Sequence, residues 1–213
     1  MTTSPAAQRT RSALVAAAAE VFARLGYAHT TIADIAGAAG TSRPSFYQYF
    51  TSKDEIFEAV VAQLHERLIE VQDVPDVDPG DIASVAQCSI AAYLEAYVRE
   101  QRLLVVLEHQ SLDDPALRAL YDEIVEHAGA RAQRFIERAI REGGARPAAS
   151  PEALVRALAG MVVRFADHVR QNPAVREQAG LELGQIFVAL LGLPNPSPSP
   201  KGADRRSGGR PPS

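Results

Sequence analysis

Side chains suited to contacting nucleic acid follow one another closely within residues 42–53. The guanidinium of Arg43 can donate two hydrogen bonds to a guanine in the major groove, and Pro44 can touch a thymine methyl group. Ser42 and Gln48 are expected on the same exposed face. Hydroxyl and ammonium groups suit the phosphate contacts that fix the position of a protein along the DNA duplex. Four side chains supply such groups: Ser45, Tyr47, Tyr49 and Lys53. The stretch therefore predicts a surface that reads DNA. The alternative is a corner of an all-helical enzyme, with the tyrosines in its core.

A second set of side chains could enclose a small molecule. Its members are bulky or carry a polar tip, on helices otherwise rich in Ala, Leu and Val: Tyr93, Tyr97, His109, Tyr121, Phe135, Met161 and Phe165. Ligand sites between helices are mostly apolar, with a few polar groups. Together these residues predict a pocket for a largely apolar effector, although each one alone is more typical of a plain core.

The sequence offers little for other chemistry. It contains no Gly-x-Ser-x-Gly, no phosphate-binding glycine loop and no His-Glu-x-x-His, so no catalytic residue and no cofactor are predicted. Glu123 and His127 have a spacing that can ligate a metal, but a solvated helical pair is the simpler interpretation and no metal is predicted. Cys88, the single cysteine, lies among small apolar residues and is expected to be buried rather than redox-active.

The candidate DNA-reading residues require a helix-turn-helix to present them. A first helix is expected from about Arg11 to Leu25, ended by a glycine. Thr31 to Asp34 form a capping box that opens a second helix. A tight turn at 39–41 follows, and Ser42 caps a third helix with proline in its first turn. The side chains expected to pack between the helices are Ile32, Ile35, Ala36 and Phe46.

The rest of the chain also has the pattern of helices. A second capping box at 52–55 opens a long helix that leads out of the helix-turn-helix. Residues 73–81 are rich in Pro, Gly and Asp and are expected to form a loop. Further helices are expected at 81–99, 101–112, 115–142, 151–171 and 174–192. With no strand alternation and no hairpin signal, the fold class is all-α.

Two of these helices are apolar on more than one side, which predicts a second subunit. In the helix 151–171, one apolar stripe is joined by a second apolar surface. The stripe consists of Leu154, Leu158, Val162, Phe165 and Val169, and the second surface of Val155, Ala159 and Val163. The helix 174–192 repeats this with Leu183, Ile186, Phe187, Leu190 and Leu191. Such helices need more than one neighbour to cover them. A homodimer with a four-helix interface is therefore expected, and its two-fold symmetry predicts a palindromic operator.

The charge distribution agrees with DNA contact at one end of the molecule. Residues 1–53 carry five basic and two acidic side chains, whereas 54–193 carry 13 Arg and 23 acids within a chain of net charge -4. No apolar run approaches the ~18 residues of a membrane span, and the start lacks the apolar region of a signal peptide. The lone cysteine fits a reducing compartment. A cytoplasmic protein without a membrane partner is expected.

The stretch from Arg11 to Phe57 resembles the DNA-binding region of the tetracycline-repressor (TetR) family. Its Thr-Thr, Ile-Ala, Ala-Gly, Ser and Tyr-x-Tyr-Phe elements, followed by Thr-Ser-Lys-Asp-Glu-Ile-Phe, match that family's pattern nearly position by position. The resemblance adds a phosphate contact for Thr31 and implies base reading by Arg43 and Pro44. One departure is Thr41, where the family usually has Val, followed by Arg-Pro in place of Lys-Gly or Lys-Pro. We expect this to alter operator preference without abolishing binding.

The resemblance implies an all-helical homodimer of about nine helices per subunit, with a variable effector-binding body and usually repression. The expected organisation is a flexible arm (1–10), a helix-turn-helix domain (11–53), an effector-binding and dimerisation domain (54–193) and a disordered tail (194–213). The function expected is a DNA-binding transcriptional regulator, not an enzyme, released from its operator by a small molecule. A transcriptional activator, a helical enzyme and a ligand-free architectural protein are the alternatives.

Overall fold

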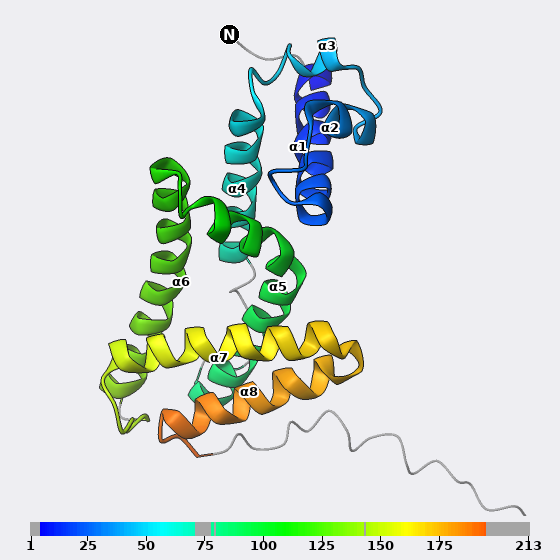
Figure 1. Ribbon diagram of the computed structural model, residues 1–213. Coiled ribbons are helices and arrows are strands. Elements are labelled where there is room, and N and C mark those ends of the chain that lie inside the picture. The colour runs from blue at the N-terminus through cyan, green and yellow to red at the C-terminus, as the bar shows by residue number, and fades with distance from the viewer. Residues whose placement is uncertain (1–4, 71–77, 79, 143, 195–213) are drawn as a thin grey trace, which may run out of the picture.

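The computed structural model describes residues 5–70, 78, 80–142 and 144–194 (Figure 1). Within these residues there are eight α-helices, one short 3-10 helix and no strand, so the all-α prediction of about nine helices is confirmed. The helices are α1 (Pro5–Leu25), α2 (Ile32–Ala38), α3 (Arg43–Phe46), α4 (Lys53–Glu70), α5 (Ile82–Gln110), α6 (Pro115–Arg141), α7 (Pro151–Gln171), η1 (Pro173–Val175) and α8 (Arg176–Leu190). The predicted disordered tail lies outside the described residues, apart from residue 194.

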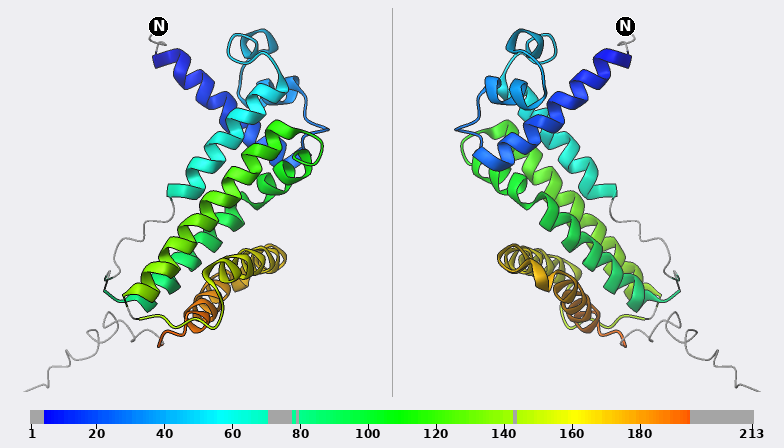
Figure 2. Two further views of the ribbon diagram at one scale, coloured as in Figure 1. Left: turned by 90° about the vertical axis from the view of Figure 1, so that its left-hand side faces the viewer. Right: turned by 90° about the vertical axis from the view of Figure 1, so that its right-hand side faces the viewer.

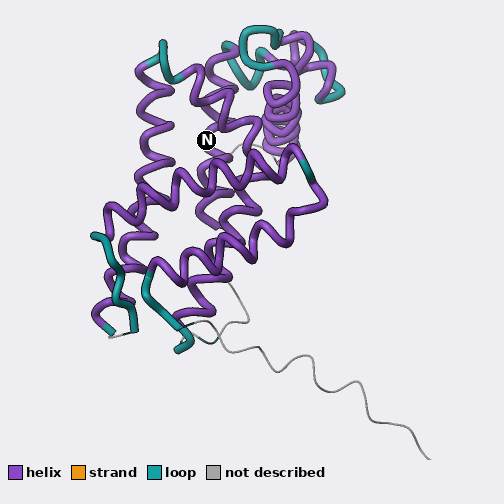
Figure 3. Tube along the Cα trace, turned by 60° about the horizontal axis from the view of Figure 1, so that its bottom comes forward, coloured by secondary structure: helices purple, strands orange, loops and turns teal. Residues whose placement is uncertain are grey.

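The helices form three groups along the molecule. The first three lie together at one end, and α4 leads away from them (Figure 1). Figure 2 shows α4, α5 and α6 running along one another, and all three pairs are in contact. At the opposite end α7 and α8 lie side by side, and α8 packs extensively on α5. Short loops join most of these helices, as the tube in Figure 3 shows.

The first helix begins earlier than the sequence predicted. Residues 5–10 were expected in a flexible arm, but they are the first turns of α1. The prediction was wrong here because the apolar periodicity starts only at Leu14. Proline is tolerated in the first turn of a helix, and the alanines and arginine that follow favour helix without needing a buried face.

The segment 82–110 is one continuous helix, not the two helices predicted at 81–99 and 101–112. The sequence suggested a break because the polar run from Glu100 interrupts the apolar pattern. Tertiary contacts explain why the helix continues. Glu100 accepts two hydrogen bonds from Arg67 of α4, at 2.9 and 3.0 Å, and Gln101 donates to Asp167 of α7 at 2.8 Å. Partners on neighbouring helices therefore satisfy Glu100 and the amide nitrogen of Gln101.

The remaining helix boundaries agree with the sequence. The helices expected at 115–142 and 151–171 are α6 and α7, each capped at its start by the side chain of the preceding residue. The helix expected at 174–192 begins as the 3-10 turn η1 and continues as α8. Most of the loop predicted at 73–81 lies outside the described residues, but Asp81 at its end caps α5 by accepting from the Ser84 N–H at 3.0 Å.

Two clusters of buried side chains hold the molecule together. The first joins α1–α4 to the second half of α5 and the first half of α6, through residues such as Phe22, Phe57 and Leu107. The second joins the rest of α5 and α6 to α7 and α8. Tyr97 packs against both clusters. The first cluster contains buried residues on both sides of the domain boundary predicted between residues 53 and 54. The two predicted domains therefore share this core, and the boundary between them stays a prediction.

Candidate nucleic-acid interface and ligand site

The start of α2 is fixed by the predicted capping box. The Thr31 hydroxyl accepts a hydrogen bond from the Asp34 N–H at 3.2 Å, and the Asp34 carboxylate accepts from the Thr31 N–H at 2.9 Å. The hydrogen bonds from the Thr31 hydroxyl and then from its N–H hold the pKa of Asp34 below its usual value. The carboxylate therefore stays charged at the positive end of the helix dipole, where it is favourable.

The turn between α2 and α3 has the geometry that the glycine predicted. Gly40 has a φ of 65°, in the left-handed region, and the Thr41 N–H donates to the Ala36 carbonyl at 2.9 Å. Ser42 then caps α3, its hydroxyl accepting from the Ser45 N–H at 3.3 Å. Ile35, Ala36 and Phe46 are buried and hold the two helices together, while Ile32 is half-buried. This is the arrangement of a helix-turn-helix.

The predicted DNA-reading side chains share one end of the molecule. Ser42, Arg43, Pro44, Tyr47 and Gln48 are exposed, as is Thr31, while Ser45 and Tyr49 are half-buried. Arg43 makes no ion pair or side-chain hydrogen bond with any described residue, which leaves all of its donors available. The Tyr47 ring packs edge-on against Phe46, and the residue remains 50% exposed. The surface offers a fixed aromatic ring beside an unpaired cation.

Lys53 differs from the other predicted phosphate contacts because it already has partners. Its ammonium donates to the Tyr27 carbonyl at 2.9 Å and to the Thr30 carbonyl at 3.2 Å, and lies 4.2 Å from the centre of the Tyr27 ring. The Tyr27 hydroxyl donates to Asp54. Sequence reasoning missed Tyr27 and Asp54. Their pairing joins residues far apart in the chain, and no local pattern marks it.

The start of α4 is tied to the segment before it. The Ser52 hydroxyl accepts from the Glu55 N–H at 3.0 Å, as the second capping box predicted. The reciprocal bond differs, because the Glu55 carboxylate accepts from the N–H and hydroxyl of Thr51 instead, at 2.6 and 2.7 Å. These hydrogen bonds, the one from the Thr51 N–H foremost, lower the pKa of Glu55. The helix that leaves the helix-turn-helix is therefore firmly attached to it.

Three of the predicted effector-pocket residues come together between the helices. Tyr93 and Tyr97 lie on α5 with ring centres 6.5 Å apart, and Tyr121 of α6 is near enough to both to affect their ionisation. Burial, followed by the neighbouring Tyr121, raises the pKa of Tyr97 to about 12. Burial also raises the pKa values of Tyr93 and Tyr121. All three hydroxyls therefore keep their protons at neutral pH.

The other predicted pocket residues are distributed differently. Phe135 packs against Phe187 with ring centres 6.1 Å apart, and Met161 and Phe165 are half-buried against the same second core cluster. His109 is exposed in the last turn of α5, outside the buried clusters. Sequence reasoning missed Gln101, which is 5% exposed and hydrogen-bonded to Asp167. Its spacing of four residues from Tyr97 is the signal that could have found it.

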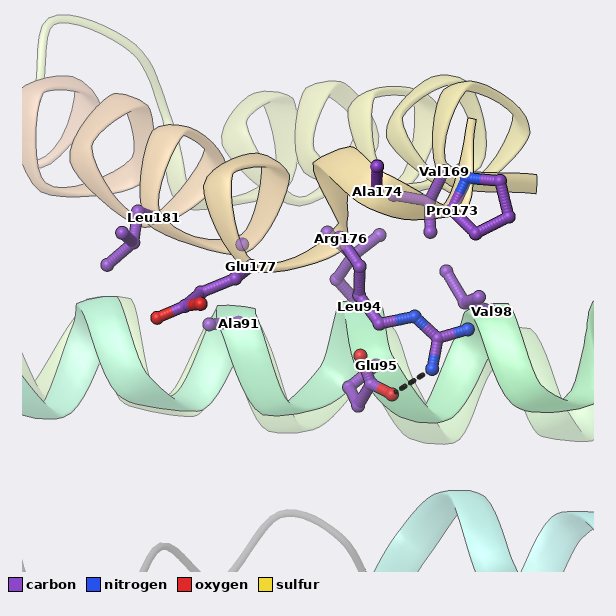
Figure 4. Close-up of a pocket in the computed structure, with 11 residues that line it drawn as sticks. Ala91, Leu94, Glu95, Val98, Val169, Pro173, Ala174, Arg176, Glu177 and Leu181 are labelled. Carbon is purple, nitrogen blue, oxygen red and sulfur yellow. Dashed lines mark hydrogen bonds and ion pairs between the residues drawn. The ribbon is translucent and has the colours of Figure 1, made fainter. Parts of the chain in front are cut away.

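A groove lies on another side of α5, away from these tyrosines. It has a volume of about 600 Å³ and is bounded by α5, the end of α7, η1 and the start of α8 (Figure 4). Its walls include Ala91, Leu94 and Val98, and an ion pair of 2.9 Å joins Arg176 to Glu95 at one edge. None of the predicted pocket residues lines it.

The candidates for metal or redox chemistry are scattered. Cys88 carries a free thiol and is half-buried, not fully buried as expected. His127 packs edge-on against His65 of α4, with ring centres 5.5 Å apart. Among the residues that the structure describes, no group of three or more His, Cys, Asp and Glu side chains is placed to hold a metal ion. Within the same residues, no helix is both long and apolar enough to cross a bilayer.

The faces of α7 and α8 turned away from the core expose apolar side chains. Of the first stripe predicted on α7, Leu154, Leu158, Val162 and Val169 are buried within the subunit. On the second predicted surface Val163 stays 38% exposed, and Ile186 on α8 is 37% exposed. One stripe therefore serves the subunit's own core, and a second apolar face remains on its surface.

Known proteins resemble the chain in its first helices and in its overall fold. Residues 14–60 match the family model described as bacterial regulatory proteins, tetR family. The HTH-type transcriptional regulator TtgR of Pseudomonas putida is 34% identical over 110 residues, 49% of this chain and 51% of that protein. The uncharacterized HTH-type transcriptional regulator TtgW of the same species is 31% identical over 54% of this chain and 84% of its own length. The matches to TtgR and several others span only about half the length of those relatives.

Solved structures share the architecture over nearly the whole described chain. A TetR transcriptional regulator from Chloroflexus aurantiacus J-10-FL superposes with a TM-score of 0.71 at 22% identity, covering 85% of this chain and 95% of that one. Salmonella enterica GusR gives a TM-score of 0.70 at 20% identity, covering 89% and 98%. The match at the helix-turn-helix, the relatives and the shared fold lead to one conclusion: the chain belongs to the TetR family of bacterial regulatory proteins.

Proposed function

We propose that this protein is a transcriptional repressor that binds a palindromic operator as a homodimer and is released by a small, largely apolar effector. The observation that carries the proposal is the exposed Arg43 at the start of a capped reader helix, with no ion pair to any residue that the structure describes. A free guanidinium beside a proline at this place suits direct reading of a major-groove edge. The named relatives are transcriptional regulators, and we propose no enzymatic activity. We also propose a cytoplasmic location, where the protein would have access to DNA.

The remaining predicted contacts fit this docking. Thr31, Ser42, Ser45, Tyr47, Gln48, Tyr49 and Lys53 share the helix-turn-helix with Arg43 and Pro44. We assign Pro44 and Gln48 to base edges and the hydroxyl-bearing side chains to phosphates. Lys53 donates two hydrogen bonds to carbonyl oxygens, and an ammonium has three N–H groups, so one remains for a phosphate.

Control by an effector would pass through α4. This helix begins in the DNA-binding unit, where Ser52 caps it, and ends against α5, where Arg67 is bonded to Glu100. The two reader helices of a dimer must reach major grooves about 34–36 Å apart, so a small tilt of α4 spoils the fit. A ligand near Tyr93 and Tyr97 would act on the same stretch of α5 that holds α4. The effector must favour the state that does not bind DNA.

The test is an operator selected from random DNA fragments by the wild-type protein. We expect enrichment of a palindrome, and we expect Arg43→Ala to weaken binding to it by roughly 1–3 kcal/mol and to relax its sequence preference. Arg118→Ala is the matched control, because it removes the same charge from an exposed i,i+4 ion pair on α6. Failure to enrich any sequence would refute the proposal. Equal losses in the two variants would show that only net charge matters. A reporter gene then distinguishes repression from activation.

A further inference from the structure

Gln101 is a buried amide with one group unsatisfied. It lies in the middle of α5 and is 5% exposed. Its side-chain nitrogen donates to the Asp167 carboxylate at 2.8 Å. Because an ionised carboxylate only accepts hydrogen bonds, the amide nitrogen must face Asp167 and the amide oxygen must point the other way. That oxygen is buried and finds no donor in the structure. An acceptor left in this state costs free energy, which a donor brought by a ligand would recover.

The residues around Gln101 define what such a ligand must look like. Tyr93, Tyr97 and Gln101 are spaced four residues apart, so they share one face of α5. Tyr97 packs against both core clusters, and Tyr121 completes the group from α6. The hydroxyls of these tyrosines make no hydrogen bond with another residue that the structure describes. The group therefore offers an unmet acceptor and several free hydroxyl donors within largely apolar walls.

The charges near this group exclude an anionic ligand. The ionised side chains that act on Tyr97 are the carboxylates of Glu108 and Asp167. Asp167 is already balanced by Arg164 and Arg170 on its solvent side, at 3.6 and 3.7 Å. Arg118 also acts on Tyr121, but it is paired with Asp122 at 3.0 Å. A carboxylate ligand would therefore lie beside like charge, and the cations described near the group already have partners. A cationic ligand would find the Asp167 carboxylate already bonded to Gln101 and paired with Arg164 and Arg170.

We infer that the effector is an uncharged, apolar molecule with a hydroxyl head that donates to the Gln101 amide oxygen and accepts from a tyrosine hydroxyl. This inference rests on the proposed function, because it names the ligand class of the effector site proposed there. Gln101 supplies the polar recognition, and Tyr93, Tyr97 and Tyr121 supply ring surface and hydroxyl donors. The discriminating property is the hydroxyl, since the aromatic and aliphatic walls would accept any apolar body of suitable size.

The test uses probes that share one ring system and differ in the head group. Binding of naphthalene, 2-naphthol, 2-naphthoate and 2-naphthylmethylammonium to the full-length protein is measured by calorimetry at pH 7. We expect 2-naphthol to bind about tenfold more tightly than naphthalene, as one or two net hydrogen bonds would give, and 2-naphthoate to bind most weakly. Gln101→Leu should abolish the advantage of 2-naphthol while leaving naphthalene binding in place.

Two further variants keep the test decisive. Tyr97→Phe removes only a hydroxyl and should reduce the preference for 2-naphthol even if Gln101→Leu folds poorly. Gln110→Leu changes a glutamine to leucine at the end of the same helix, outside the tyrosine group, and should retain the full preference. Equal affinities for naphthol and naphthalene would mean that a water satisfies Gln101, and the inference would fail. It would also fail if no probe bound, or if the carboxylate or the ammonium bound best.

Operator binding separates this inference from the proposed function. Without a probe, the wild type should bind the selected operator, and this measurement does not depend on the head group that the effector site prefers. If operator binding holds and the head-group preference is absent, only the ligand class is wrong. If the wild type binds no operator, the proposed function itself fails.

Discussion

Lys53 combines two tasks at a single residue. Its ammonium closes the loop between α1 and α2 by bonding two carbonyl oxygens, while its position beside the reader helix suits a phosphate. Hydrogen bonds to a charged group are stronger than neutral ones. The Tyr27 ring beneath it packs on Phe22 and Phe57, so Lys53 connects the loop to the buried aromatic side chains of the first cluster.

We therefore predict two separable effects of Lys53→Ala. The free energy of unfolding should fall by about 1–3 kcal/mol, because two carbonyls lose a charged donor. The dependence of operator affinity on salt should weaken by about one unit of slope, because one phosphate contact is lost. Urea unfolding measures the first effect and titrations at several salt concentrations the second. Lys53→Met keeps the side-chain stem and isolates the ammonium. Unchanged stability would show that the two bonds are incidental.

Tyr97 should make the stability of the protein sensitive to alkaline pH. Its pKa is about 12 in the folded state and about 10 in an unfolded chain. The unfolded state therefore loses the proton first, and the stabilisation present below pH ~10 is lost as the pH rises toward 12. Urea unfolding at pH 9 and pH 11 should show a smaller loss for Tyr97→Phe than for the wild type. An identical loss in both would mean that other groups cause the decline.

At the scale of elements, the close crossing of α5 and α8 depends on glycine. A Cβ placed on Gly184 would lie 2.5 Å from the Gln87 Cγ and 3.1 Å from the Gln87 carbonyl oxygen. The side chain could move, but the backbone of α5 could not without separating the helices. A Cβ placed on Gly180, one turn earlier, would lie 3.5 Å from the Ala91 Cβ, which is an ordinary contact distance. Small residues at this spacing let the two helix backbones approach, and Phe187 and Val188 fill the space beside them.

Gly184→Ala should therefore destabilise the protein by roughly 1–3 kcal/mol, the usual cost of overpacking a tight contact. Gly37→Ala is the matched control, because a Cβ there meets nothing within 4 Å and the residue is also helical. That control should stabilise the protein by roughly 0.5–1 kcal/mol, the difference in helix propensity between the two residues. Thermal unfolding of both variants distinguishes them. If they shift the melting temperature in the same direction, the crossing is less tight than described.

At the scale of the whole molecule, α7 and α8 place an apolar surface at the end opposite the reader helix. Val163 and Ile186 are exposed there although their neighbours on the same helices are buried. Pairing this surface across a two-fold axis would cover it and would set the two reader helices at a fixed separation. The match of protein symmetry to operator symmetry would then follow from these two helices alone.

We predict that Val163→Glu combined with Ile186→Glu converts a dimer into a monomer, because each partner would bury unpaired carboxylates. Light scattering at micromolar concentration measures the mass, and circular dichroism checks that the helices persist. Leu112→Glu is the control, since that side chain is 70% exposed after α5 and away from the surface in question. A wild-type protein that is monomeric at this concentration would exclude the dimer. A dimer that survives the double substitution would place the interface elsewhere.

Local patterns were sufficient for much of the helix-turn-helix. The Thr31 capping box, the Gly40 turn and the Ser42 cap each depend on residues a few positions apart, and all three are present. The ends of α6 and α7 could be predicted equally well, because proline, glycine and capping residues determine a helix end within one or two turns. The start of α1 was predicted too late. Residues of high helix propensity extend this helix before its apolar face begins, and the apolar pattern does not mark them.

What only the tertiary structure decided involves partners that are distant in the chain. Periodicity suggested a break at residue 100, but Arg67 and Asp167 satisfy Glu100 and Gln101 from other helices, so α5 continues. The same contacts leave the Gln101 oxygen unpaired, and the sequence carries no sign of that. The set of pocket candidates was separated in the same way: three tyrosines meet, whereas His109 is exposed. Sequence spacing fixes which residues share a helix face, but only packing fixes which faces meet.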